Sequence, residues 1–420
     1  MKENQAIVTY PYRWVVLLVF MFVMGIQQLL WITFASITSS AVAFYKVSDL
    51  SIGMLSMVFM IVYIVVSFPA SWLIDTYGFR VSAGLGALLT GVFGMLRGVF
   101  ADSFTLVLIC QIGIAVGQPL IVNAVSKVAA RWFPLKERAT ATGLSWLAGY
   151  LGLIVGLSLT PYLLKLYSLP SMLIIYGILS IITVFAFMIF AKEQPPTPQC
   201  SPGQEQRVLV FDGLKQMIKK KDFIFFNIVF FIGLGVFNGL STWIENIIRP
   251  RGFTSAQAGV MGGLMVACGV LGSAIIPMLS DRFRNRSGFV LLAVTGSVPG
   301  LIGITYAQSY WLLLVSAGVL GFFMLSTAPI GFQYCAEISY PAPEATSTGV
   351  LMTMGQFAGI LFIFGMDLLK SPKTGSMTLP MLGMILLMLF TIFLASKLKE
   401  SKLLLDNKIA GGKLHEEELH

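Results

Sequence analysis

Twelve apolar stretches of about 20 residues follow one another along this chain. A helix needs roughly 20 apolar residues to cross the hydrocarbon core of a bilayer. The stretches are apolar throughout and do not alternate with polar residues, which excludes a membrane β-barrel. Of the 420 residues, 56% are hydrophobic and only 11% are charged, too few charges for a soluble protein of this size. The sequence therefore predicts an all-α integral membrane protein. Its twelve predicted spans are 14–39, 52–74, 81–100, 105–130, 139–164, 170–191, 223–247, 256–280, 288–306, 311–336, 346–369 and 376–396.

One long break, residues 192–222, interrupts this series and begins Pro-rich and ends basic. It predicts a cytoplasmic linker with an amphipathic segment, between a six-helix bundle at 1–191 and a second at 223–396. Residues 397–420 form a predicted cytoplasmic tail. Most of the 28 Lys and Arg residues fall in the segments that share a side with the amino terminus. Positive residues favour the cytoplasmic side, so both termini are predicted to be cytoplasmic. The net charge of +9 therefore reports orientation, and no nucleic-acid partner is expected.

The two halves of the sequence are weakly similar at an offset of 206 residues. Asp75 in WLIDTYGFR then falls on Asp281 in MLSDRFRNR, and Trp31 falls on Phe237. The segment ATATG at 139–143 falls on ATSTG at 345–349. One offset that serves several helices indicates a duplication, in which two pseudo-symmetric bundles hold a binding site between them near the membrane midplane.

The segment SWLIDTYGFR at 71–80 resembles the signature that major facilitator carriers have between their second and third helices, with Ser71 and Thr76 as departures. Three further stretches resemble the feline leukaemia virus subgroup C receptor family: residues 31–80, QPLIVNAVSKVAARWF at 118–133 and GFFMLSTAPIGFQYCAEISYP at 321–341. The resemblance implies the major facilitator fold and, in a prokaryotic-type member, transport by alternating access. Members of the family are associated with choline, ethanolamine and haem, and a related branch with vitamin-like solutes. The resemblance also implies an inner, plasma-membrane location, a monomer, and neither enzyme activity nor a cofactor.

In the choline-carrying members of that family, a Trp on helix 1, a Tyr on helix 7 and Gln residues on helices 4 and 11 enclose the ligand. Trp31, Gln118 and Gln356 match these positions, whereas Asn238 stands where the Tyr would be. The loss of an aromatic wall weakens a quaternary-ammonium cage, so the amide favours a substrate with hydrogen-bonding groups. The predicted substrate-binding residues are Trp31, Gln118, Asn238, Gln356, Tyr150, Phe237 and Tyr334; no catalytic or metal-binding residue is expected.

Charged residues at the cytoplasmic helix ends are candidates for gating. A carboxylate there can stabilise a neighbouring helix amino terminus and pair with an arginine. We expect Asp75 to face the start of the eleventh span and to pair with Arg131, and Asp281 to face the start of the fifth span. Both would act as latches of the outward-open state; a solvated loop carboxylate is the simpler alternative. The predicted gating residues are Asp75, Arg80, Arg131, Asp281 and Arg282.

The acidic residues lie near helix ends or in loops, and none is predicted at the midplane, where proton relays usually lie. This favours uniport. Two alternatives remain open: a proton-coupled symporter of a small organic anion, with Arg97 or Lys127 as the anion partner, and a membrane receptor that binds without transport. Gln27, Gln28 and Asn123 are further polar candidates, for which an interhelical hydrogen bond is the rival interpretation.

Overall fold

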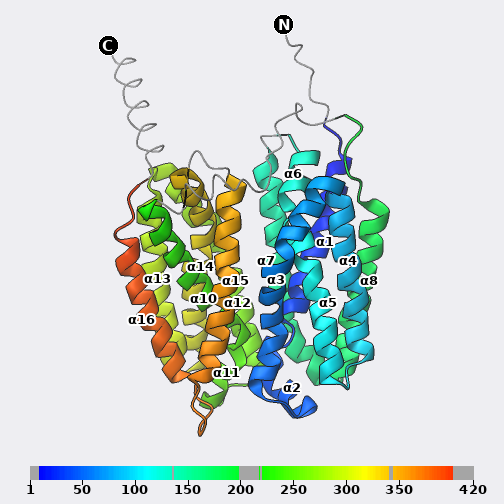
Figure 1. Cartoon of the computed structure of the whole chain (residues 1–420). Helices are drawn as coiled ribbons and strands as arrows, with labels where there is room; N and C mark the ends of the chain where they lie inside the picture. The colour runs from blue at the N-terminus through cyan, green and yellow to red at the C-terminus, as the bar shows by residue number, and fades with distance from the viewer. Residues whose placement is uncertain (1–8, 135–136, 198–216, 218–219, 340–343, 401–420) are drawn as a thin grey trace, which may run out of the picture. The chain divides into compact units, whose positions relative to one another are not determined.

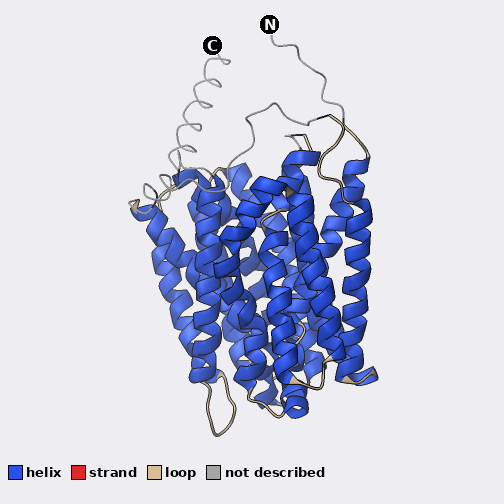
Figure 2. Ribbon diagram, turned by 45° about the vertical axis from the view of Figure 1, so that its right-hand side comes forward, coloured by secondary structure: helices blue, strands red, loops and turns tan. Residues whose placement is uncertain are grey.

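A computed structural model of the chain describes residues 9–134, 137–197, 217, 220–339 and 344–400. In this part of the chain, twelve helices are long and apolar enough to cross a membrane. Figure 2 shows helices joined by loops, and no described residue lies in a strand. The predicted all-α membrane fold with twelve spans is therefore confirmed.

The described chain forms two compact units. The first contains residues 1–207 together with 241–249 and 254–263, and the second contains the remainder. The short segments 241–249 and 254–263 belong to the sequence after the predicted linker, yet they cluster with the amino-terminal helices.

The first unit is built from helices α1 (Tyr12–Ile32), α2 (Thr38–Tyr45), α3 (Asp49–Tyr77), α4 (Phe79–Val99), α5 (Phe104–Val122), α6 (Val125–Trp132), α7 (Arg138–Leu166) and α8 (Leu169–Phe190), with a 3-10 turn, η1, at Ala35–Ile37. Figure 1 shows α2 and α6 at opposite ends of this bundle. Serine residues begin three of the helices: the hydroxyls of Ser48, Ser103 and Ser168 each accept a hydrogen bond from a backbone N–H of the first turn.

Glycine allows α1 and α7 to pack in close contact. A Cβ atom built at Gly152 would lie 2.0 Å from the carbonyl oxygen of Gly25, and one built at Gly25 would lie 3.1 Å from the carbonyl oxygen of Ala148. Small residues at such positions allow helix backbones to approach closely in membranes. A hydrophobic core of aromatic and aliphatic side chains lies within the first unit, and Phe20 and Phe187 are fully buried in it.

The second unit contains α10 (Lys221–Thr242), most of α12 (Ser255–Phe283), α13 (Arg286–Tyr306), α14 (Tyr310–Ser339), α15 (Glu344–Leu368) and α16 (Thr378–Ala395). Helices α12 and α14 approach closely, because a Cβ atom at Gly321 would overlap the carbonyl oxygen of Met265. Gly272 makes the same kind of contact with the backbone of Phe322.

Three predicted spans differ in detail from the structure. The first runs from Arg13 to Tyr45 and is interrupted at residues 33–37, whereas the sequence predicted an end at 39. The seventh ends at Thr242, and the short helix α11 (Ile244–Ile248) and the turn η3 (Arg249–Arg251) follow it. The fourth breaks at residues 123–124, between α5 and α6. Most of the predicted linker lies outside the described residues.

Candidate substrate site and gates

The interruption of the first span places Trp31 in the last turn of α1, near the middle of that span. Carbonyl groups that lose their helical partner at a break need other donors. Here the Thr33 hydroxyl donates to the Leu29 oxygen over 2.8 Å. The Leu30 oxygen accepts from a guanidinium nitrogen of Arg97 over 3.1 Å. The break is thus held by the side chain of Thr33, the residue that follows α1, and by that of Arg97 on α4.

The Trp31 indole is held in one orientation. Its ring nitrogen donates to the Ser56 carbonyl oxygen over 3.2 Å, and 7% of the residue is exposed. A buried indole N–H usually finds such a partner. The hydrogen bond to α3 fixes the plane of the ring, so that a face of the indole can serve as a preformed contact for a ligand.

The amide side chains of the first unit fall into two groups, and the first is structural. Gln27 is fully buried, donates to the Ile114 oxygen over 3.1 Å and accepts from Thr90 over 2.5 Å. The Asn123 amide donates to Ser67 and Ser71 and accepts from the Tyr63 hydroxyl over 2.9 Å; these contacts join α3 to the break after α5. For Gln27 and Asn123, the structure favours the interhelical hydrogen bond over a ligand contact.

The second group has free acceptor capacity. The carbonyl oxygens of Gln28 and Gln118 are buried and have no hydrogen-bond partner among the described residues, although both side chains are only partly buried. Side chains on a helix lean toward its amino terminus. Gln27 on α1 is level with Ile114 on α5, and because the two helices are antiparallel, Trp31 and Gln118 lie on opposite sides of that level. From the helical rise, they bracket a section of about 12 Å.

The other predicted substrate residues occupy three helices. Tyr150 is partly buried on α7 in the first unit. In the second unit, Phe237 and Asn238 lie on α10 and Gln356 lies on α15; Asn238 is 8% exposed. Tyr334 on α14 is fully buried, packs against Phe226 with a centroid distance of 5.1 Å and donates its hydroxyl to the Lys399 oxygen. These contacts give Tyr334 a packing role, and we leave it out of the site proposed below.

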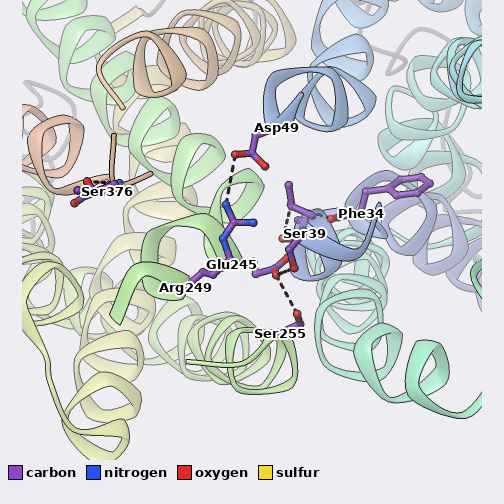
Figure 3. Close-up of polar contacts among 10 residues, drawn as sticks. Phe34, Ser39, Asp49, Glu245, Arg249, Ser255 and Ser376 are labelled. Atoms are coloured by element: carbon purple, nitrogen blue, oxygen red, sulfur yellow. Dashed lines mark hydrogen bonds and ion pairs between the residues drawn. The ribbon is translucent and has the colours of Figure 1, made fainter. Parts of the chain in front are cut away.

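A second polar site in the first unit lies at the predicted external end, around Glu245 on α11 (Figure 3). Glu245 is 1% exposed. Its carboxylate accepts from the Ser39 backbone N–H over 3.0 Å, from the Ser39 hydroxyl and from the Ser255 hydroxyl over 3.0 Å. Because Ser39 lies in the first turn of α2, the carboxylate also meets the positive end of that helix. Glu245 thus joins α2, α11 and α12.

Two more contacts support this end. Arg249 and Asp49, at the start of α3, form an ion pair at 3.5 Å. The fully buried Trp243 packs on Gly53, where a Cβ atom would lie 2.7 Å from the ring. Sequence reasoning placed Glu245 near the outer end of the seventh predicted span, 223–247, and gave it no role, because a carboxylate at the end of a span looks like a solvated residue in the sequence.

At the predicted cytoplasmic end of the first unit, the predicted Asp75–Arg131 pair is wrong. Asp75 forms its ion pair with Lys127 at 3.6 Å, four residues before Arg131 and thus one turn away on α6. Arg131 lies 4.0 Å from Glu193. The Glu193 carboxylate accepts from the backbone N–H groups of Arg80 and Phe79 over 2.7 and 3.3 Å, at the amino terminus of α4. Sequence reasoning missed Glu193.

Burial raises the pKa of Glu193. The two backbone donors and the nearby charges of Arg131 and Lys127 oppose this effect but do not cancel it. Gly78, with a φ of +86°, ends α3 and begins α4 beside this carboxylate. A Cβ atom there would lie within 2.6 Å of the carboxylate atoms, so glycine is required on both conformational and steric grounds.

The equivalent end of the second unit is organised by Arg286, which sequence reasoning also missed. Arg286 forms ion pairs with Asp281 and, at 3.4 Å, with Glu337, and it donates to the Ser280 hydroxyl over 3.3 Å. Arg282 and Arg80 are exposed. The gating roles of Asp75, Arg80, Arg131, Asp281 and Arg282 stay predictions. Among the described residues, no group of three or more His, Cys, Asp or Glu side chains could hold a metal ion.

Comparisons with known proteins place this arrangement in a family. Residues 13–363 match the Major Facilitator Superfamily. "Choline/ethanolamine transporter FLVCR1" of Felis catus is 31% identical over 395 residues, which cover 87% of this chain and 70% of that protein. "Solute carrier family 49 member A3" of Danio rerio is 30% identical over 379 residues, 86% of this chain and 80% of that protein. A solved structure of a bacterial homologue of the human lysosomal transporter Spinster, inward-facing and unoccupied, superposes with a TM-score of 0.74 at 15% identity, over 92% of this chain and 97% of that one.

The match to the superfamily covers most of the chain, and the relatives at 30–31% identity are covered over more than two thirds of their length. The fold, the twelve spans and the sequence agree with one another. The chain is a membrane transporter of the Major Facilitator Superfamily and, within it, belongs to the feline leukaemia virus subgroup C receptor family.

Proposed function

We propose that this transporter carries a small polar organic solute, of the choline or ethanolamine kind or a vitamin-like or amino-acid-like nutrient. The observation that carries the proposal is that the first unit holds both an oriented Trp31 indole on α1 and a carbonyl oxygen of Gln118 on α5 that has no partner among the described residues. An aromatic face attracts an ammonium group, and an amide oxygen accepts a hydrogen bond from a hydroxyl or amine. Asn238 and Gln356 are included as proposed substrate-binding residues because the sequence predicts that role for them.

We propose uniport by alternating access as the mode of transport. The acidic residues of the described spans lie near helix ends, as Asp75, Asp281 and Asp367 do, and this supports a carrier without an embedded carboxylate relay. Glu245 closes the external end in one state. Its described partners are the neutral donors of Ser39 and Ser255, so its contacts can be exchanged for water when that end opens.

Orientation and assembly complete the proposal. Lys127 and Arg131 lie at the same end of the first bundle as the start of α1, which supports cytoplasmic termini in the plasma membrane. The carrier acts as a monomer without enzyme activity.

A thermal-shift screen of the purified full chain tests the substrate. Choline, ethanolamine, amino acids and nucleosides are added singly, and a ligand at 100 times its Kd should stabilise the folded state by about 2.7 kcal/mol. Trp31→Ala and Gln118→Leu should lose the shift. Gln27→Leu is the matched control: it should lower the melting temperature without ligand, because it breaks the bonds to Ile114 and Thr90, and it should keep the ligand shift. Full ligand response in both site variants would refute the site.

A further inference from the structure

The side chain of Arg97, in the last turn of α4, is fully buried inside the first unit. One terminal nitrogen, Nη1, donates to the Leu30 oxygen over 3.1 Å and to Gln111 Oε1 over 2.8 Å. Gln111 donates in turn to the Leu55 oxygen over 3.1 Å. The guanidinium carbon lies 5.5 Å from the centre of the Phe34 ring. These partners are all neutral.

The other edge of the guanidinium has a different environment. Its Nε and Nη2 atoms are buried and have no hydrogen-bond partner among the described residues. These two nitrogens form the side edge of the fork and present two parallel N–H donors, the geometry that receives a carboxylate in a bidentate pair. The Tyr45 hydroxyl is also buried without a partner, and it lies within electrostatic range of Arg97.

No carboxylate of the described chain neutralises this charge. Asp102 is near enough to act on Tyr45, but it is exposed and forms no ion pair with Arg97 in the described residues. An isolated buried charge is strongly unfavourable, and buried charges in proteins are normally paired. Because lipid surrounds the bundle, bulk water can solvate this charge less readily than it could in a soluble protein.

We propose that the Nε and Nη2 edge of Arg97 binds a small anion inside the amino-terminal bundle, beside the break in the first span. Two anions share this chemistry: an inorganic ion such as chloride, and a carboxylate group on the transported solute. The carboxylate case rests on the proposed function, because the Leu30 carbonyl held by Arg97 is adjacent to Trp31. The chloride case is independent of the substrate.

The test is anion-dependent unfolding of the purified full chain. The protein is brought into sodium methanesulfonate, whose anion carries no carboxylate, and chloride or formate is titrated in at constant ionic strength. Binding should raise the melting temperature by about 2 °C or more at saturation. Arg97→Gln should abolish the response, and Arg97→Lys, which keeps the charge without the forked edge, should weaken it. Arg13→Gln is the matched control, because Arg13 has a carboxylate partner in Glu137 at 3.0 Å, and it should keep the response.

A response to both anions, or to chloride alone, that Arg97→Gln abolishes assigns an inorganic site, and a response to formate alone assigns a substrate carboxylate. No response, or an equal response in Arg97→Gln, overturns the proposal. If Arg97→Gln does not fold, bromide is soaked into wild-type crystals and the anion response of Arg97→Lys is compared with that of the wild type. An anomalous peak within about 3.5 Å of Nε and Nη2 supports the inorganic site, and no peak together with an unweakened response of Arg97→Lys to both anions refutes the proposal. If the protein responds to organic solutes but to neither anion, the anion proposal is refuted and the proposed transport function is not.

Discussion

Replacement of Gly152 by alanine is the sharpest test of how the amino-terminal bundle is packed. The added Cβ atom would lie 2.0 Å from the Gly25 oxygen and 2.7 Å from its carbonyl carbon. Because real Cβ atoms essentially never approach closer than 3.0 Å, the backbones of α1 and α7 must separate by at least about 1 Å. Both contacts are backbone atoms, so no side-chain rotation can relieve them.

The loss of stability caused by Gly152→Ala follows from this separation of the two helices. A radial gap of 0.5–1 Å forfeits about a quarter to a half of the dispersion energy of each contact. Overpacking in a well-packed core typically costs about 1–3 kcal/mol, and this site should lie at the upper end of that range. At about 2–4 °C per kcal/mol, Gly152→Ala should lower the melting temperature by roughly 5–10 °C.

Two alanine variants calibrate the measurement by thermal unfolding of purified protein. Gly143 lies on the same helix with nothing within 4 Å of its Cβ position, so Gly143→Ala should be neutral or stabilising by about 0.5–1 kcal/mol. Gly25→Ala, with 3.1 Å to the Ala148 oxygen, should fall between the two. If Gly152→Ala has the same melting temperature as Gly143→Ala, the close approach of α1 and α7 is refuted.

Three further predictions concern the charged groups. Glu245→Gln replaces charge-assisted hydrogen bonds of about 1.5–3 kcal/mol each, so labelling of single cysteines introduced at the external end should increase; unchanged labelling would count against the proposed gate. Arg286→Gln leaves the Glu337 carboxylate, whose side chain is 14% exposed, without its cation, which should cost about 2–3 kcal/mol in thermal unfolding, less than a fully buried pair. Arg282→Gln, at an exposed arginine, should cost little. Because the pKa of Glu193 is raised in the folded state, its contribution to stability is complete below the ordinary value of 4.5 and is lost as pH rises through the folded pKa. Melting temperatures measured at several mildly acidic pH values should show this loss, and Glu193→Gln should remove it. The same pH dependence in wild type and Glu193→Gln would show that Glu193 does not cause it.

The sequence was sufficient for the spans because lipid imposes a single requirement, apolar length, on every one of them. It did not predict the breaks in the first and seventh spans. WITFASIT and LSTWIEN contain no Pro or Gly at the break, and their hydroxyl side chains suit a helix as well as a turn. What holds the first break open is Arg97, 67 residues away from Leu30. A local pattern cannot contain that contact.

The same reason explains which site residues could be predicted. Gln27, Gln118 and Asn123 look alike in the sequence, since each is an amide in an apolar helix. They differ in whether partners elsewhere satisfy them: Thr90 and Ile114 complete Gln27, while the Gln118 oxygen is left without a partner. Spacing correctly indicated polar groups inside the bundle, but their division into structural and available groups depends on tertiary contacts between α1, α3, α4 and α5.

The two kinds of charged contact in this chain suit different tasks in a transporter. Arg286 is held by the exposed Asp281, by the largely buried Glu337 and by the Ser280 hydroxyl, so separating it would leave the Arg286 guanidinium and the Glu337 carboxylate unpaired. Glu245 is held by a backbone N–H and two serine hydroxyls, all neutral donors that water can replace when the site opens. A gate must close firmly enough to exclude solvent and still open within milliseconds. Neutral donors around a single carboxylate meet both demands, and this is the physical argument for the proposal that Glu245 closes the external end.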